Sequence, residues 1–146
     1  MGFSIVVDTR EQRPWAFRCP MVRKALKAGD YSVEGLEERV SVERKSLPDF
    51  VRTIVHERGR FHRELCRLAL YAAACIVVEA DLDAVLRGVH GAQLRSVSPH
   101  ALLGRALEIP HRYGVPVFWC GSRQAARAFT EKYLRKFTEW RAKEKS

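Results

Sequence analysis

The hydrophobic positions of the chain fall into short β-branched runs that are separated by longer stretches with helical spacing. Three runs are continuously apolar: SIVVD at 4–8, CIVVEA at 75–80 and VPVFWC at 115–120. Such strands are usually buried on both faces, as in a central sheet covered by helices. Two shorter segments, YSV at 31–33 and RVSVER at 39–44, alternate apolar and polar residues and are typical of a hairpin.

Helical patterns fill the stretches between these strands. We expect four helices: from Pro20 to Gly29, from Leu47 to about Tyr71, from Ser98 to Gly114 and from about Arg123 onward. In the third of these helices, Ser98 is an N-cap that is followed by proline in the first turn, and Gly114 follows the last turn. The alternation of strands and helices predicts an α/β fold, a three-layer α/β/α sandwich, in a single domain spanning residues 1–146. We expect the charged end, 142–146, to fray.

Composition and charge narrow the possible partners. A chain of 146 residues with 47% hydrophobic content and a net charge of +9 implies a polyanionic partner, with nucleic acid ahead of an anionic membrane surface. A soluble basic protein without such a partner is the alternative. No stretch approaches the roughly 18–20 apolar residues of a membrane span, and the first apolar run ends at Asp8, so we expect no signal peptide and an intracellular protein. The four cysteines form no CxxC pair, which favours free thiols over a zinc site or a disulfide framework.

The hairpin brings two acids together. If residues 35–38 form its loop, Val33 pairs with Val40 and Asp30 lies opposite Glu43. Directly opposed side chains have Cβ atoms roughly 5 Å apart, so two like charges there destabilise the sheet unless a positive group lies between them. Oxygen ligands of this kind suit Mg²⁺ or Mn²⁺.

A lysine and a third acid belong to the same predicted site. The period of two along the second hairpin strand puts Glu43 and Lys45 on one side and Arg44 on the other. A lysine beside metal-bound carboxylates can steer a water or help to deprotonate it, and can stabilise charge that develops on a phosphate. Asp8 ends the first strand at its carboxyl edge, where ligand sites of open α/β sheets collect, and is the obvious third acid.

Each of these residues also has an ordinary structural explanation. The two charged residues of the second hairpin strand can form an exposed ion pair that contributes little. Asp30 and Asp8 can be turn or loop-capping residues. Asp49 stands three residues after Ser46, which is the spacing of a helix capping box. Spacing alone leaves both explanations open.

Three motifs that follow one another along the chain help to choose between these two explanations. Asp8 to Glu11 reads D-x-R-E, residues 29–31 read GDY, and Glu43 to Asp49 reads ERK-x-x-x-D. This set resembles the signature of XPF-type structure-specific endonucleases. The resemblance continues more weakly through Gly59 and Arg60, IVVEA and the segment after Gly114, and so covers nearly the whole chain.

The resemblance implies a restriction-endonuclease-like fold of the PD-(D/E)xK group with a mixed central sheet. It implies that Mg²⁺ or Mn²⁺ is held by Asp30, Glu43 and the main-chain carbonyl of Arg44, that Asp8 assists at this metal or at a second ion, and that Lys45 positions the attacking water. Four further positions match supporting residues of the family: Arg10, Glu11, Arg44 and Asp49. The two arginines of this set resemble those that organise the acids or touch phosphate.

The sequence also departs from the family. Larger members carry a tandem helix-hairpin-helix DNA-binding domain after the nuclease domain, and some carry a helicase-like domain before it. We expect neither in the present chain, which leaves substrate choice open. Glu64 stands where relatives often have glutamine.

Basic residues predict where DNA is held. Arginine outnumbers lysine 19 to 7, which favours bidentate phosphate contacts. Arg58, Arg60 and Arg63 follow the helix that starts behind the active-site strand, so we expect them to contact phosphates near the scissile bond. A solvated helix face is the alternative.

The terminal helix repeats large apolar residues at steps of three and four. Such a stripe is more often core than interface. Its members are Ala126, Phe129, Tyr133, Phe137 and Trp140. Because the aromatic residues extend almost to the chain end, where little protein remains to cover them, we expect a homodimer through this helix.

We therefore expect a metal-dependent DNA endonuclease that cuts flapped, forked or branched DNA by water attack. One alternative is a catalytically idle subunit that binds branched DNA or acts as a scaffold on the same fold. The other is a restriction or junction-resolving nuclease. Intact Asp30, Glu43 and Lys45 argue against the idle subunit, which has no reason to keep clustered unpaired acids.

Overall fold

A mixed six-stranded sheet forms the centre of the molecule. The computed structural model describes residues 2–88 and 97–145. The strands are β1 (Ile5–Asp8), β2 (Met21–Lys24), β3 (Tyr31–Val33), β4 (Val40–Lys45), β5 (Ala73–Val78) and β6 (Val117–Trp119). They lie in the order β2-β1-β3-β4-β5-β6. β3 is antiparallel to both of its neighbours and the other pairs are parallel, so the sheet is mixed, as the family resemblance implies.

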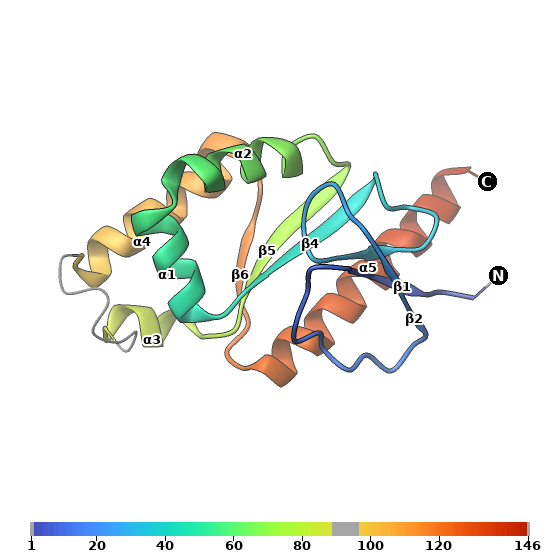
Figure 1. The fold of residues 1–146 in the computed structure, drawn as a ribbon, viewed down its shortest axis with the longest axis horizontal. Coiled ribbons are helices and arrows are strands. Elements are labelled where there is room, and N and C mark those ends of the chain that lie inside the picture. The colour runs from blue at the N-terminus through green and yellow to red at the C-terminus, as the bar shows by residue number, and fades with distance from the viewer. Residues whose placement is uncertain (1, 89–96, 146) are drawn as a thin grey trace.

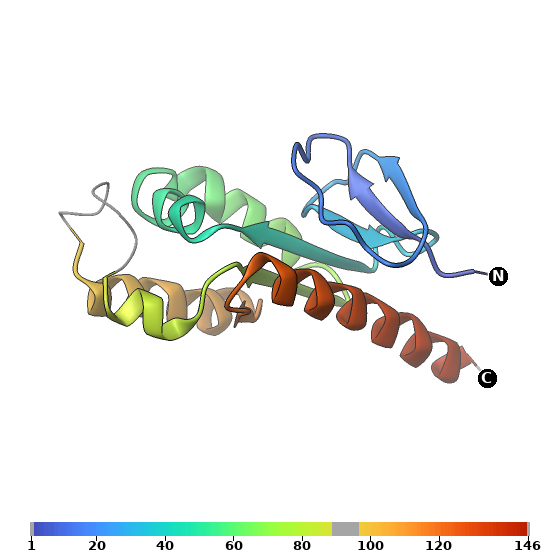
Figure 2. The same ribbon diagram turned by 90° about the horizontal axis from the view of Figure 1, so that it is seen from below.

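Helices cover both faces of this sheet. They are α1 (Leu47–His56), α2 (Arg58–Leu68), α3 (Leu82–Leu86), α4 (Pro99–Glu108), which continues into the π-helical turn η2 (Ile109–Tyr113), and α5 (Arg123–Lys145). Two views at right angles show α1, α2 and α4 on one side of the sheet and α5 on the other (Figures 1 and 2). The predicted three-layer α/β/α sandwich is confirmed.

The alternation of side chains along β5 explains why both faces are covered. Ile76 and Val78 pack into the core beneath α1, α2 and α4. Cys75 and Val77 point the other way and join the core beneath α5. All four are fully buried, which is the reason that this run is continuously apolar.

One predicted helix is wrong. Residues Met21–Lys24 form the edge strand β2, which runs parallel to β1. Lysine and alanine favour helix in this segment, but burial from Leu26 to Ala28 alternates as in an extended chain. The main-chain N–H of Leu26 donates to the carboxylate of Asp8 at 2.8 Å instead of to a helical carbonyl. The contact with β1 therefore outweighs local helix propensity, and Gly29 ends no helix.

The other helices begin close to the predicted residues. Ser46 and Ser98 are N-caps that accept from the third main-chain N–H beyond them, and Gly114 closes η2 with φ of 70°. The single helix predicted from Leu47 to about Tyr71 is instead two helices that break at Glu57, where the backbone leaves the helical region. α5 reaches Lys145 and so includes most of the segment expected to fray; fraying itself stays a prediction. No helix in the described ranges is long and apolar enough to cross a membrane.

Candidate functional site

The β3–β4 hairpin brings Asp30 and Glu43 together. Tyr31 pairs with Val42, the register that the loop length predicts, and the main-chain N–H of Asp30 donates to Val42 O at 2.8 Å. One step further along the hairpin, the two acids face each other. Only 9% of Glu43 is exposed and Asp30 is half-buried, so both carboxyl groups are largely withdrawn from solvent.

Burial and mutual repulsion change how both acids titrate. Burial raises the pKa of Asp30 to about 6, although the main-chain N–H of Arg44, which donates to its carboxylate at 2.8 Å, works in the opposite direction. Burial raises the pKa of Glu43 well above its ordinary value, and the charge of Asp30 raises it further. Two carboxyl groups that resist ionisation side by side are a common feature of functional sites, because a bound cation removes the penalty.

The GDY glycine allows the close approach of the hairpin strands. Gly29 has φ of 82°, a conformation that favours glycine, and a β-carbon at this position would overlap the hydroxyl of Ser41. That hydroxyl donates to Ala28 O at 2.7 Å. The N–H of Gly29 donates to the carboxylate of Glu64 on α2 at 2.9 Å. Glu64 therefore supports the hairpin from the neighbouring helix.

Lys45 is the cation nearest to Glu43. Its Nζ lies 3.4 Å from the carboxylate of Glu43 and donates to the hydroxyl of Thr53 on α1 at 3.3 Å. It also lies 6.0 Å from the centre of the Phe61 ring on α2. Contacts with two helices thus hold the ammonium group on the same side of β4 as Glu43, as the strand period predicts.

Asp8 lies at the end of β1, but its carboxylate is already occupied. It accepts from Arg10 Nε and from the N–H of Leu26, both at 2.8 Å. Burial raises the pKa of Asp8, but these hydrogen bonds outweigh burial and the pKa lies below its ordinary value. In residues 2–88 and 97–145, no group of three or more Asp, Glu, His or Cys side chains is arranged to hold a metal ion. The described site is therefore a carboxylate pair, with Asp8 fixed beside it by Arg10.

Arg44 organises acids on the opposite side of β4. Its guanidinium donates to both carboxylate oxygens of Glu79, at 3.0 and 3.2 Å, and to Glu11 at 3.3 Å. It also lies over the ring of Trp15, 5.3 Å from the centroid. Tyr31 donates its hydroxyl to Glu11 at 3.2 Å. This network ties the loop after β1 to β4 and to the end of β5.

Asp49 has the position that a capping box requires but only half of its bonds. Its main-chain N–H donates to the hydroxyl of Ser46 at 3.3 Å. Its carboxylate accepts from Arg52 at 2.8 Å. Asp49 also lines the site. The residue therefore holds a helix-capping position and a position beside the site at the same time.

These residues line a cleft made of two adjoining hollows of about 390 and 450 Å³. Both hollows contain the same five side chains: Arg10, Asp30, Glu43, Lys45 and Arg52. Asp8, Arg60 and Arg67 line the first, whereas Glu11, Arg44 and Asp49 line the second. The structure therefore brings all eight residues of the predicted catalytic and supporting sets to one cleft.

The three arginines predicted to contact phosphate do not act as one group. Arg60 lines the first hollow, where it pairs with Glu57 at 3.2 Å. Arg58 lines a separate cavity across α2, and Arg63 lines neither of these spaces. The reason is the helical turn, because residues two apart on a helix point about 200° apart.

Sequence reasoning missed three residues of the site. Glu79 follows β5 directly, and Lys45 pairs with Val78 in the parallel β4–β5 ladder. Parallel strands that end at one edge bring their next residues together, so this acid could have been placed. Arg52 and Thr53 are set by the angle between α1 and β4, for which the sequence carries no local signal.

The pair Asp30 and Glu43 suits a divalent cation in chemistry. Mg²⁺ keeps several of its waters and is usually bound by one or two carboxylates together with substrate phosphates, and Mn²⁺ takes similar oxygen ligands. Two acids with raised pKa values meet this need, and the ammonium group of Lys45 balances only one of their charges. A site of three acidic ligands is not what the described residues form.

Comparison with known proteins agrees with this geometry. A family model, the ERCC4 domain, matches residues 7–133. This chain belongs to the ERCC4 domain family. The chain is similar in structure to XPF from Aeropyrum pernix, with a TM-score of 0.72 and 22% identity over 92% of this chain. A structure of the same archaeal protein in complex with DNA gives a TM-score of 0.70 and 23% identity over 93% of the chain. No curated protein matches the sequence.

The ERCC4 domain described here is smaller than these solved structures. It spans 61% of one and 65% of the other. At this level of identity the likeness concerns the fold. The resemblance to XPF-type endonucleases inferred from D-x-R-E, GDY and ERK-x-x-x-D is confirmed in family and fold.

Proposed function

We propose that this ERCC4 domain is a DNA endonuclease that depends on Mg²⁺ or Mn²⁺ and acts on flapped, forked or branched DNA inside the cell. The observation that carries the proposal is the buried pair Asp30 and Glu43, with raised pKa values, next to Lys45 in an open cleft. Membership of the ERCC4 family and the likeness to an XPF structure solved with DNA support it.

In the proposed reaction each residue has a separate task. Asp30 and Glu43 would hold the cation, with the main-chain carbonyl of Arg44 as a further ligand. When bound, the cation lowers the pKa of a water ligand and neutralises phosphate charge. Lys45, fixed by Thr53, orients the attacking water and stabilises the negative charge that develops on the phosphate. Asp8, held by Arg10, adds a negative charge beside the pair that favours cation binding.

Arginines of the cleft are the proposed contacts with the DNA backbone. Arg52, Arg60 and Arg67 lie along α1 and α2 in the first hollow. Each of them forms an ion pair with a nearby acid: Arg52 with Asp49 and Glu57, Arg60 with Glu57, and Arg67 with Glu64. These exposed pairs contribute little to stability, so phosphate can replace the acids as partners. Arg44 is engaged by Glu79 and Glu11 and serves the framework of the site.

The test is cleavage of labelled flap, fork, junction and linear duplex DNA with Mg²⁺ or Mn²⁺. Asp30→Asn, Glu43→Gln and Lys45→Ala should each lower the cleavage rate by a factor of 100 or more, roughly the range for losing a charged catalytic group. Asp83→Asn removes an exposed acid that pairs with Arg87 on α3 and serves as the matched control. Activity that survives all three site substitutions would refute the mechanism.

The alternatives give different results in the same experiment. A scaffold subunit binds branched DNA but cuts none of the substrates with either metal. A restriction-type enzyme cuts linear duplex at a fixed sequence, whereas a structure-specific enzyme cuts at the branch whatever its sequence. The two acids at the hairpin share one ammonium group, that of Lys45, and favour the endonuclease over the scaffold, because burying two carboxyl groups with only one countercharge costs stability.

We also propose that two copies pair through α5. Phe118, Phe129, Tyr133, Phe137 and Trp140 line an apolar groove of about 510 Å³ along this helix. Trp140 at its end is 62% exposed. β6, whose Phe118 borders the groove, is an edge strand of the sheet, so a second copy would cover aromatic surface and strand edge together.

A further inference from the structure

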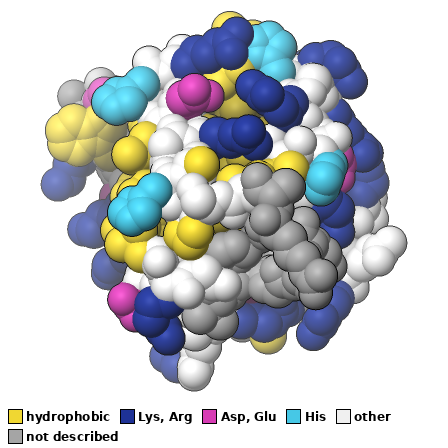
Figure 3. All heavy atoms as spheres, turned by 90° about the vertical axis from the view of Figure 1, so that its left-hand side faces the viewer, with side chains coloured by type: hydrophobic (Ala, Val, Ile, Leu, Met, Phe, Trp, Pro, Cys, Tyr) yellow, Lys and Arg dark blue, Asp and Glu magenta, His cyan; other side chains and the backbone are white. Residues whose placement is uncertain are grey.

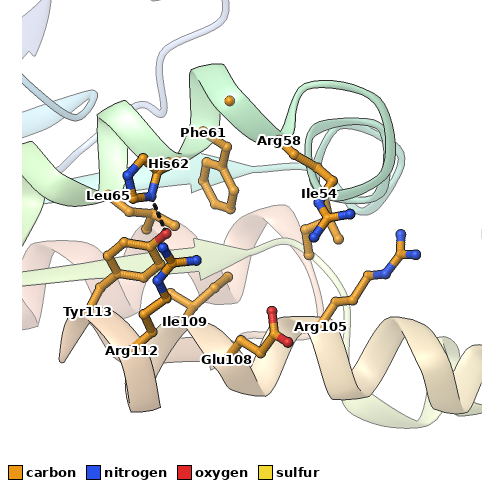
Figure 4. A pocket seen from close by; sticks show the side chains of 11 residues that line it. Ile54, Arg58, Phe61, His62, Leu65, Arg105, Glu108, Ile109, Arg112 and Tyr113 are labelled. Carbon is orange, nitrogen blue, oxygen red and sulfur yellow. Dashed lines mark hydrogen bonds between the residues drawn. The ribbon is translucent and has the colours of Figure 1, made fainter.

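A second cavity lies across α2 from the cleft. Its volume is about 310 Å³, and α1, α2, α4 and η2 supply its walls. Figure 4 shows Arg58 and Phe61 directed into it from above and Arg105, Glu108 and Arg112 from below. In the end-on view, Lys and Arg side chains gather around a hydrophobic area in the upper part of the molecule (Figure 3).

The cationic side chains of this cavity lack acidic partners. In the described part of the chain, no hydrogen bond or ion pair engages Arg58 or Arg105, and Arg112 contacts only the ring of Tyr113, 5.2 Å from its centroid. On the cleft side of the same helix, by contrast, Arg60 and Arg67 are both paired. Three arginines from two helices therefore converge without partners.

One acid shares the cavity and does not neutralise it. Glu108 lies between the two arginines of the lower wall (Figure 4), and no ion pair joins it to either of them. Three guanidinium groups against one carboxylate leave a surplus of positive charge. Such a surplus around a concave surface attracts a polyanion.

The floor of the cavity is apolar and aromatic. Ile54, Leu65 and Ile109 form its base together with Phe61, which is only 7% exposed, and Tyr113 supplies a more accessible ring. The hydroxyl of Tyr113 is fixed by a hydrogen bond to His62 Nδ1 (Figure 4). Rings that accept a stacked base beside arginines that accept phosphate are the combination by which proteins hold single-stranded nucleic acid.

Phe61 connects this cavity with the catalytic cleft. Its side chain lines both spaces, and its ring faces Lys45 on the cleft side. The two spaces are therefore separated by one helix, roughly 10–12 Å across with its side chains. A strand that leaves the cleft reaches the second cavity by crossing α2.

We propose that the Arg58–Arg105–Arg112 cavity binds the single-stranded continuation of the DNA that occupies the cleft, with phosphates on the arginines and a base against Tyr113. This inference rests on the proposed nuclease function, since it assigns the second cavity to the same substrate. It makes Arg105 and Arg112, which lie far from Lys45 in sequence, determinants of binding to single strands rather than of chemistry.

The test measures binding in EDTA, so that its result does not depend on cleavage. Fluorescence anisotropy of a labelled oligothymidylate should show about tenfold weaker binding, or more, for the double variant Arg105→Glu, Arg112→Glu. The plot of log affinity against log salt should become shallower by about 1.4, because each phosphate contact to a single strand contributes roughly 0.7. The matched control is the double variant Arg18→Glu, Arg39→Glu, which carries the same change of charge at two exposed arginines outside the cavity and the cleft and should bind as wild type does. Equal losses in both variants would reduce the effect to net charge and overturn the proposal.

Two further measurements distinguish the ligand and locate it. A photoreactive 5-iodouracil oligonucleotide should crosslink to Tyr113 or His62; crosslinks only outside the cavity would overturn the assignment. Unlabelled competitors identify the kind of ligand. If thymidine monophosphate displaces the labelled oligonucleotide as well as unlabelled oligonucleotide does, the cavity binds a free nucleotide instead; if an acidic peptide does so, it binds a protein partner. With Mg²⁺, the double variant should raise KM for flapped DNA while leaving kcat within about twofold. If wild type cleaves no DNA with Mg²⁺, the proposed nuclease function is refuted. The binding measured in EDTA still tests the cavity, because it does not depend on cleavage.

Discussion

The guanidinium of Arg44 and the carboxylate of Glu79 form a two-pronged ion pair between the ends of β4 and β5, with N–O distances of 3.0 and 3.2 Å. Only 13% of the arginine side chain and 9% of the glutamate side chain are exposed. The pair explains why a charged residue follows Val42 on the apolar side of β4. Glu79 also accepts from the indole N–H of Trp15 at 2.7 Å, so the acid is satisfied from two directions.

We predict that Arg44→Ala destabilises the fold by about 3 kcal/mol, the lower end of the range for breaking a buried ion pair, because Glu11 loses its ion pair and Glu79 keeps only the more distant Arg123, 3.6 Å away. Arg44→Lys should recover only part of this loss, since an ammonium group cannot make the two-pronged contact. Urea denaturation of the metal-free chain measures both effects. Arg87→Ala, which breaks an exposed pair with Asp83, should cost less than about 1 kcal/mol. Similar costs for the two alanine variants would contradict a structural role for Arg44.

Gly29 and Gly35 offer a matched pair of substitutions. Both have positive φ, 82° and 92°, but a β-carbon would overlap Ser41 at Gly29 and meet no atom within 4 Å at Gly35. Gly35→Ala should therefore cost only the backbone strain of about 1–2 kcal/mol. Gly29→Ala should cost more and should also weaken metal binding, because it displaces the strand that carries Asp30. Equal unfolding free energies for the two variants would show that the approach to Ser41 does not matter.

The raised pKa of Asp30 predicts how stability depends on pH without metal. Because the folded-state pKa is about 6 and the ordinary value is 3.8, the folded chain holds this proton more tightly than the unfolded chain. The resulting stability is complete below about pH 4 and is lost as the pH rises through 6. The loss is on the order of 1–3 kcal/mol. The pKa of Asp8 is lowered, so its contribution to stability is lost only as the pH falls below the ordinary pKa of an aspartate. Asp8 therefore does not oppose this trend.

Thermal unfolding at several pH values in EDTA checks this expectation. The melting temperature should fall between pH 4 and 7, and Asp30→Asn should flatten the curve and raise the melting temperature at pH 7. Mg²⁺ or Mn²⁺ should restore stability to wild type but not to Asp30→Asn, since a ligand that binds only the folded state stabilises it. A melting temperature that rises steadily from pH 4 to 7 in wild type would contradict the buried carboxylate pair.

Trp140→Glu should convert a dimer into a monomer if copies pair through α5. The substitution places a charge at the exposed end of the aromatic groove. Light scattering after gel filtration gives the mass directly. Ala142→Glu, two residues beyond Trp140 and about 200° further around the helix, adds the same charge on another side of α5 and should leave the mass unchanged. A wild-type chain that is monomeric at high concentration would refute the homodimer.

The sequence predicts those parts of the site that depend on local spacing. The hairpin register, the opposition of Asp30 and Glu43 and the side of β4 taken by Lys45 all follow from a loop of four residues and a period of two. The break at Glu57 and the edge strand β2 could not be predicted, because they depend on packing between segments that are distant in sequence. The bond from Leu26 to Asp8 is such a case, since it overrides the helix propensity of its own segment.

The partners of Arg44 are a second feature that could not be predicted from local spacing. Sequence spacing placed this residue on the apolar side of β4 but offered no reason for its charge. The reason lies in Glu79, which is 35 positions away and reaches Arg44 only because β5 runs parallel to β4. The separation of Arg58 from Arg60 is different, because helical geometry alone could have predicted it.

The two edges of the sheet differ in a way that limits how the molecule can assemble. β2 carries Arg23 and Lys24, whose side chains are held by the loop after β1 and by Glu34 and Glu37. β6, in contrast, has the sequence VFW and no charge. Charged edges resist the addition of another strand, so only one edge can be extended by a neighbour. If copies associate through the edge strand β6, we therefore expect the association to stop at two copies and not to continue into a fibre.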